Sequence, residues 1–331
     1  RRMNPTDERG AVAVTVALML TALLGIGALV VDTGSLQEKR RELQNGADAG
    51  ALAIAEDCAR AQNPSNLTAV ARCAGYPNTA PAYMADNAGV GNATTAVKGA
   101  NQITVNVITT DPVPYKFAQV FGLSGKKVSA SATATWGAPL SMPTIPIAIS
   151  WCQWSSFTSS GAAYALPPYL TPPKVIPLHE TDNSAGDCTG PAGKQLPGGF
   201  SWVEPNLPKC LVSADEGEWV DSKPGASVPD GSCETTLQQA VSTGKPIALP
   251  VFEETNDKTG AGAEYKVAGF LAVHVTGFKF PSVESSPAPN CNPLGGNDVK
   301  SCLIGHITQL VTTGTPGSTS SFGVIAFKLT A

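Results

Sequence analysis

The sequence has few charged and few aromatic side chains, and its charge limits what the chain can bind. Charged residues make up 15% of its 331 residues, well below the roughly 25% of ordinary soluble domains. Aromatic residues make up 6%. The formal net charge of -4 offers no basic surface to a nucleic-acid backbone. We therefore expect no nucleic-acid partner.

The eight cysteines include no C-x-x-C pair, the spacing typical of zinc ligands and thioredoxin-like sites. They are Cys58, Cys73, Cys152, Cys188, Cys210, Cys233, Cys291 and Cys302. An even number of widely spaced cysteines predicts disulfides in an oxidising compartment. Cys58 and Cys73 are close enough in sequence to pair, and Cys291 and Cys302 are expected to close a local loop. The other four allow three pairings.

Residues 11–31 contain no charged side chain at all. A run of about 20 apolar residues is long enough to cross the hydrocarbon core of a bilayer. The run lacks the polar stripe of a core helix, and it is too long for a signal peptide and has no small-residue cleavage site after it. We predict a transmembrane helix over residues 11–31, preceded by a tail of residues 1–10.

The orientation of this span follows from the cysteines and not from the flanking charge. Arg1, Arg2 and Arg9 precede the span, and Lys39, Arg40 and Arg41 follow it. These counts are equal, so the positive-inside rule does not decide. Every cysteine follows the span, and disulfides form outside the cytoplasm. We predict a single-pass protein of the cell membrane with a cytoplasmic amino terminus and an extracytoplasmic carboxy-terminal domain.

Helical periodicity continues beyond the span, over residues 32–61, up to Asn63-Pro64. A seam of apolar and small residues recurs along it at close to three- and four-residue spacing, and small residues are frequent around its centre. The seam residues are Leu36, Leu43, Ala47, Gly50 and Ile54. Small residues let two helices approach closely. One helix over residues 11–61 would be about 75 Å long at 1.5 Å per residue, with half of it projecting from the membrane.

Three pieces of sequence occur around this helix in a fixed order. Glu8-Arg9-Gly10-Ala11 precedes the apolar run, Val31-Asp32-Thr33-Gly34 follows it, and residues 40–53 read RRELQNGADAGALA. Together they resemble the amino-terminal region of TadG-like Flp pilus-assembly proteins of the tight-adherence system. The resemblance covers roughly the first 60 residues. It implies a bitopic, pilin-like protein whose amino-terminal helix contacts lipid and also pilus-assembly components or pilin subunits.

One position departs from the related pilins. Those pilins are cut after a glycine and carry glutamate at the fifth mature position, which neutralises the new amino terminus of a neighbouring subunit. Counting from Gly10, the fifth position is Thr15. A cut here would leave an unpaired terminal charge in lipid, which is costly. We therefore predict that residues 1–10 stay on the mature chain.

The rest of the chain predicts two further folded parts, so the fold class is α+β. Alternation at residues 103–107 and 128–134 indicates strands, and residues 113–121 read as a short helix ending at Gly122. Residues 62–138 are therefore expected to form a small pilin-like α+β module beside the long helix.

A proline-rich linker is expected over residues 139–150. Residues 151–331 then hold six cysteines and four strand candidates, at 247–252, 265–280, 303–311 and 322–329. No long helical period is visible there. This pattern predicts a β-rich, disulfide-tied extracytoplasmic domain.

Two patterns point to chemistry, and each has a plainer interpretation. Residues 30–35 contain the D-T-G of aspartic proteases, but Asp32 ends an apolar helix and no second copy exists. We interpret it as an interfacial helix position. The histidines are His179, His274 and His306. Two of them can meet across a sheet and bind a metal, although strand-surface or core positions are favoured.

Two surface patterns remain. The oxygen-rich loop of residues 253–260 lacks the spacing of a calcium loop, so a solvated turn is favoured. Trp202 and Trp219 are possible surface aromatics of a sugar-binding face, although tryptophans buried beside disulfides are favoured.

We expect no cofactor and no enzymatic site, because no nucleophile stands in a G-x-S-x-G elbow. The sequence thus predicts a membrane-anchored Flp pilus-assembly or minor pilin-like structural protein. The alternative is an anchored binding module for a glycan or cell-wall polymer.

Overall fold

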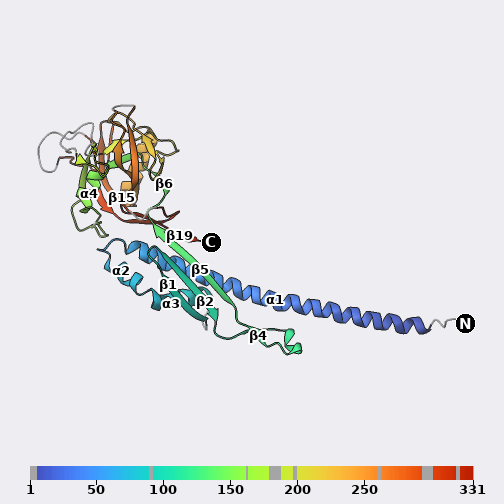
Figure 1. The fold of residues 1–331 in the computed structure, drawn as a ribbon. Coiled ribbons are helices and arrows are strands. Elements are labelled where there is room, and N and C mark those ends of the chain that lie inside the picture. The colour runs from blue at the N-terminus through green and yellow to red at the C-terminus, as the bar shows by residue number, and fades with distance from the viewer. Residues whose placement is uncertain are drawn as a thin grey trace.

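The computed structural model describes residues 6–88, 92–161, 163–178, 188–196, 200–258, 262–292, 301–317 and 321–330. One continuous helix, α1 (Thr6–Arg60), confirms the expected long amino-terminal helix. Figure 1 shows that its amino-terminal half projects alone, while its other half lies along a sheet. A second β-rich part sits beyond the carboxy-terminal end of α1.

The sequence of α1 favours an uninterrupted helix, because no proline occurs in it. Within the apolar half, the hydroxyl of Thr21 donates to the carbonyl of Ala17 at 2.8 Å, one turn back. Such bonds satisfy a polar side chain where water is absent. In the last turn, Arg60 pairs with Glu56 at 2.7 Å.

Two short helices cover the carboxy-terminal half of α1, namely α2 (Leu67–Ala74) and α3 (Tyr76–Ala88). The side chain of Asn66 caps α2 by accepting from the backbone N–H of Ala69 at 3.1 Å. The predicted disulfide between Cys58 and Cys73 is present and ties α1 to α2. This cross-link holds the end of the long helix in the folded part.

The first sheet packs against the same half of α1, and its strand order is β1-β2-β5-β19-β18. The strands are β1 (Asn92–Lys98), β2 (Gln102–Thr109), β5 (Ser129–Gly137), β19 (Val324–Thr330) and β18 (Leu310–Thr313). All neighbours are antiparallel except β18 and β19. Alternate side chains of β2 and β5 face the helix, so Val105 and Trp136 share one core with residues of α1.

The second sheet has the order β11-β7-β14-β15-β17-β8, and β13 and β16 also pair with β15. Its strands are β11 (Phe200–Trp202), β7 (Ile147–Ser150), β14 (Ile247–Thr255), β15 (Glu264–Phe280), β17 (Cys302–Thr308), β8 (Lys174–Pro177), β13 (Trp219–Asp221) and β16 (Val283–Glu284). Small ladders join β6 (Ser141–Thr144) to β12 (Val212–Asp215) and β9 (Cys188–Thr189) to β10 (Gln195–Leu196). The β-rich character expected for this part is therefore present.

The strand pairings differ from the expected partition of the chain in two ways. Residues 139–150 contain β6 and β7 and are not a free linker. The candidate at 303–311 is divided between β17 and β18, because the chain there crosses from the second sheet to the first. β19 then pairs with β5, from Ala326 opposite Gly137 to Thr330 opposite Thr133. An open edge of β5 needs a hydrogen-bonding partner, and a strand distant in sequence supplies it.

Two helices in the carboxy-terminal part were not expected, α4 (Trp151–Thr158) and α5 (Gly231–Thr243). Local signals for α5 exist: Asp230 accepts from the backbone at its start, and Gly244 ends it at φ 64°. The three open cysteine pairings resolve as Cys152–Cys188 and Cys210–Cys233, and Cys291–Cys302 closes its local loop as predicted.

The short helix expected over residues 113–121 is smaller than predicted. Val113–Pro114 forms β3, which pairs with β4 (Gly125–Lys126), and the 3-10 helix η1 (Ala118–Phe121) lies between them. The expected end at Gly122 is correct, with φ 80°. The segment is thus a hairpin with a helical tip, which we call the hairpin of residues 113–126.

Candidate functional site

The apolar run in the amino-terminal half of α1 carries apolar side chains on every side. None of its most apolar window is buried, and its exposed side chains include Val12, Leu18, Leu24 and Val30. Exposing so much apolar surface to water is unfavourable, at about 25 cal/mol per Å². This single apolar helix indicates single-pass membrane anchoring.

The seam on the carboxy-terminal half of α1 is covered by other parts of the chain, unlike the exposed apolar half. Leu43, Ala47, Gly50 and Ile54 are buried, and Leu36 packs at the edge of the same core. A Cβ atom on Gly50 would meet the sulfur of Met84 on α3 at 3.5 Å. The seam therefore faces α3 and the first sheet of its own chain. Small residues did indicate a close approach, but they carry no signal that identifies the partner.

Asp32 lies where the apolar run ends, and only 3% of its surface is exposed. Its carboxylate accepts from the backbone N–H groups of Lys116, Phe117 and Ala118, the last at 2.7 Å. Three successive backbone donors form an anion-binding concavity. The interpretation of Asp32 as an interfacial helix position was therefore incomplete, because this side chain holds the hairpin of residues 113–126 against α1.

The electrostatics of Asp32 follow from these contacts. Burial raises the pKa of its carboxyl, whereas the three backbone donors favour the charged form. The donors outweigh the burial, so the pKa lies below its ordinary value. The carboxylate is therefore charged at neutral pH. It serves as an acceptor for backbone groups, in contrast to a protease dyad that shares a proton.

Two of the three histidines meet across the second sheet. His274 on β15 is directly opposite His306 on β17, and their ring centroids are 5.9 Å apart. Tyr169 stacks on both rings, at 4.3 and 4.9 Å. Burial lowers the pKa of both histidines, and repulsion by His274 lowers that of His306 further. His179 lies outside the described residues.

No third metal ligand joins this pair in the part of the chain that the structure describes, where no group of three His, Cys, Asp or Glu gathers. The stacking on Tyr169 makes the pair part of an aromatic cluster, which fits the plainer interpretation of these histidines. The neutral form of both imidazoles is favoured at neutral pH, because burial penalises the charged form.

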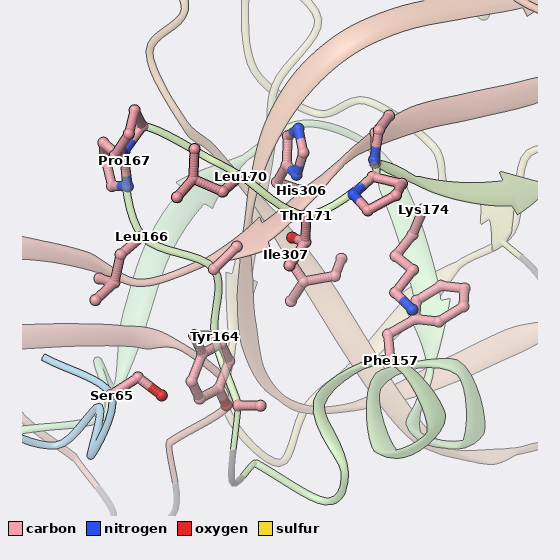
Figure 2. A pocket seen from close by; sticks show the side chains of 15 residues that line it. Ser65, Phe157, Tyr164, Leu166, Pro167, Leu170, Thr171, Lys174, His306 and Ile307 are labelled. Atoms are coloured by element: carbon pink, nitrogen blue, oxygen red, sulfur yellow. The ribbon is translucent and has the colours of Figure 1, made fainter.

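The segment that carries Tyr169 also lines a cavity of about 770 Å³. Figure 2 shows Tyr164 and Leu166 on one side of it and Lys174 beside the ring of Phe157 on the other. The cavity lies where the segment after α1 meets the carboxy-terminal part, since Asn63 donates to the carbonyl of Tyr164 at 3.3 Å. Its walls are mainly apolar and proline-rich, and its lining residues include the ionisable side chains of Lys174 and His306.

The tryptophans do not form the possible pair of surface rings, and the favoured buried position is the one that Trp202 takes. Trp202 is buried and packs on Phe280, with 5.1 Å between ring centroids, so its prediction as a surface aromatic is wrong. Its register opposite Ile147 places it within the second sheet. Trp219 on β13 is 42% exposed and is the one exposed ring among the five tryptophans, all of which are described. Glycan binding stays a prediction.

The oxygen-rich residues 253–258 lie at the end of β14 and in the turn after it, and lysines pair with their carboxylates. Lys194 contacts Glu254 at 3.0 Å and Asp257 at 3.5 Å, and Lys266 lies near Glu253 and Glu254. Residues 259 and 260 of this loop lie outside the described residues. The ion pairs favour the solvated turn over a calcium site, because the carboxylates already have cationic partners.

Comparison with known proteins finds a match within α1. Residues 10–57 match the family Tad, described as Putative Flp pilus-assembly TadE/G-like. This segment is Tad-like. No curated protein and no solved structure matches the chain. The Tad-like segment includes both the exposed apolar run of α1 and all five seam residues. It confirms the resemblance seen in the sequence and supports a structural role in pilus assembly.

Proposed function

We propose that this chain is a membrane-retained assembly component of an Flp pilus, with residues 1–10 in the cytoplasm and both sheets outside. The observation that supports it is the division of one helix: the Tad-like segment is free and apolar in its first half and built into a folded part in its second. A helix of this kind anchors a folded head at a bilayer and presents its first half to other apolar helices.

The division of α1 also limits which surface meets pilus components. Because the seam is covered by α3 and the first sheet, contacts through the helix fall on the apolar half. Gly25 and Gly27 have open space around them, which lets another helix approach closely. The partners proposed are therefore lipid and the apolar helices of other pilus-assembly proteins or pilin subunits.

Deletion of the gene tests the role in pilus assembly. Exchange of the span tests whether residues 11–31 contact other pilus components. Deletion should remove or sharply reduce surface pili, and the unaltered chain should restore them. A chain whose residues 11–31 are replaced by an unrelated span of equal length should stay anchored but fail to restore pili. Normal pili in the deletion strain would overturn the proposed role. Full rescue by the exchanged span would show that the helix is an anchor alone.

Whether the chain is cleaved after Gly10 distinguishes an assembly component from a minor pilin. Thr15 stands where the related pilins have glutamate, so a cut after Gly10 would create an unneutralised terminal charge in lipid. We expect amino-terminal sequencing of the membrane-purified protein to read through Gly10. A mature chain that begins at Ala11 would instead assign the protein to the minor pilins.

A further inference from the structure

The hairpin of residues 113–126 exposes a group of large apolar side chains at its tip. Val120 is 85% exposed and Phe121 is 79% exposed, and Phe117 and Leu123 are exposed beside them. Apolar side chains scattered singly on a surface are ordinary, whereas a contiguous group on one loop marks an interaction site. All four belong to η1 and the residues next to it.

The position of this tip is fixed by Asp32. The carboxylate binds the backbone of residues 116–118 at the start of η1, and Asp32 is the first residue after the apolar run of residues 11–31. Figure 1 shows the hairpin lying along α1 and reaching past the end of the sheet toward the projecting half of the helix. The exposed tip is therefore continuous with the surface that crosses the membrane.

Basic side chains surround the base of the hairpin. Lys116 precedes η1, and Lys126 and Lys127 follow it. A groove of about 320 Å³ between the hairpin and α1 is lined by Arg40, Lys126 and Lys127, among others. An apolar tip with a basic collar matches the cross-section of a bilayer surface, where phosphate groups lie above the hydrocarbon.

We propose that the hairpin of residues 113–126 inserts its tip into the leaflet from which α1 emerges, while Arg40, Lys126 and Lys127 bind the phosphate groups of anionic phospholipids. The inference rests on the proposed membrane span of α1. A helix alone leaves the folded part free to rotate and tilt, whereas a second contact point set by Asp32 fixes its orientation to the bilayer. Continuity with the span favours lipid over a protein partner.

The test uses the full chain reconstituted in vesicles of phosphatidylcholine and phosphatidylglycerol. An environment-sensitive fluorophore is attached through V120C at the tip, through L24C in the span, or through Leu170→Cys on an exposed loop of the carboxy-terminal part. Quenchers carried on lipid chains should reduce the emission of the V120C and L24C labels at least about twofold. The Leu170→Cys label should respond only to iodide in the water.

A second arm tests the basic collar. In the V120C background, replacing both Lys126 and Lys127 by Gln should weaken lipid quenching of the label. The loss should be larger in vesicles with phosphatidylglycerol than in vesicles of phosphatidylcholine alone, because each basic residue near an anionic surface contributes to binding. The matched control is Lys98→Gln, on an exposed position of β1. An equal loss in both vesicle types would overturn the phosphate contact.

The outcomes separate this inference from the proposed function. If the L24C label is quenched from lipid and the V120C label is quenched by iodide, the tip is in water and the inference fails while the anchor stands. A V120C label shielded from both quenchers would assign the tip to a protein partner and would equally overturn the lipid contact. An L24C label that lipid quenchers do not reach would overturn the membrane span itself.

Discussion

The two halves of α1 are built from the same backbone conformation but have different residues on their surfaces. The first half carries large apolar side chains in every direction, such as Leu18, Leu23 and Leu29, and all of them are exposed. The second half carries small residues on one face and charged residues elsewhere, and Ala47 and Ala51 on that face are fully buried. A small face lets a sheet lie close to the helix axis.

The difference shows that helix formation and helix surroundings are specified separately. Alanine and leucine, which are good helix formers, occur in both halves, and glutamate and arginine add to them in the second half. In the first half valine, threonine and glycine are weaker helix formers, but a backbone in lipid must satisfy its own hydrogen bonds and therefore stays helical. The size and distribution of side chains then decide whether the helix meets lipid on all sides or a protein core on one side. Substitutions that are equal in chemistry should therefore have unequal effects in the two halves.

The largest effect is expected from truncating a seam residue. Leu43→Ala should destabilise the folded part by about 2–5 kcal/mol, because it leaves a cavity in a packed core. The matched change Leu24→Ala in the exposed half should alter the same stability by less than about 0.5 kcal/mol. Urea denaturation of the detergent-solubilised chain, followed by near-ultraviolet circular dichroism, measures both. Equal shifts would mean that the two halves are not packed differently.

A charge in the apolar half should have the next largest effect, and on insertion instead of folding. Leu20→Arg should oppose membrane insertion by about 2.5–3.5 kcal/mol, the cost of arginine at the centre of a span. Gln37→Arg adds the same charge at an exposed position beyond the span and should leave insertion unchanged. The fraction of protein that resists carbonate extraction reports the difference. Identical fractions would contradict the assignment of the span.

Asp32 stands at the junction of the two halves, and its removal should loosen the hairpin alone. Asp32→Asn should speed proteolysis within residues 113–126 and leave the urea midpoint of the sheets nearly unchanged. Since the pKa of Asp32 is held below its ordinary value, the unaltered contact is complete at neutral pH and is lost as the pH falls below about 4.

The control for this position is Asp111→Asn, which changes an exposed carboxylate close to the same hairpin. It should keep both the slow proteolysis and its acceleration in acid. Asp32→Asn should abolish that acceleration, since the titrating group is gone. A hairpin that is cleaved equally fast in both variants at neutral pH would show that Asp32 does not hold it.

The smallest expected effect is a pH dependence of stability that arises in the second sheet. His274 and His306 lie in the second sheet, and burial lowers the pKa of both below 6.5. The unfolded chain then binds more protons than the folded one. The free energy of unfolding is therefore unaffected by the two histidines above pH 6.5 and falls as the pH drops below that value. His306→Gln should reduce the slope of urea midpoint against pH between about 5 and 6.5. An unchanged slope would exclude the pair as its origin.

Features with a local signal could be predicted from the sequence. The long helix, the strands at 247–252 and 265–280, and the disulfides Cys58–Cys73 and Cys291–Cys302 each depend on periodicity or on short separations in the chain. The helix α5 also had local signals that the expected fold did not use: Asp230 and Gly244 stand at its ends, and its buried residues Cys233, Leu237 and Ala240 recur at four- and three-residue spacing.

Features that depend on distant pairing could not be predicted. Nothing near Val324 indicates that β19 pairs with β5 and not with the second sheet. Likewise, Asp32 belongs to a D-T-G sequence that matches a protease motif, while the residues that it contacts lie 84 to 86 positions further along the chain. The seam showed that something approaches α1 closely, but side-chain size cannot distinguish an internal sheet from a second subunit.

The return of β19 to the first sheet has a consequence for the order in which the chain folds as it is synthesised. If α1 is retained in the bilayer, β1, β2 and β5 emerge early, but β5 keeps one open edge until residues 324–330 arrive. The first core also lacks Ile325 and Phe327 until then. The first sheet therefore closes only after β19 has joined it, and a chain that stalls or is truncated before residue 324 presents the edge of β5 to any neighbouring strand.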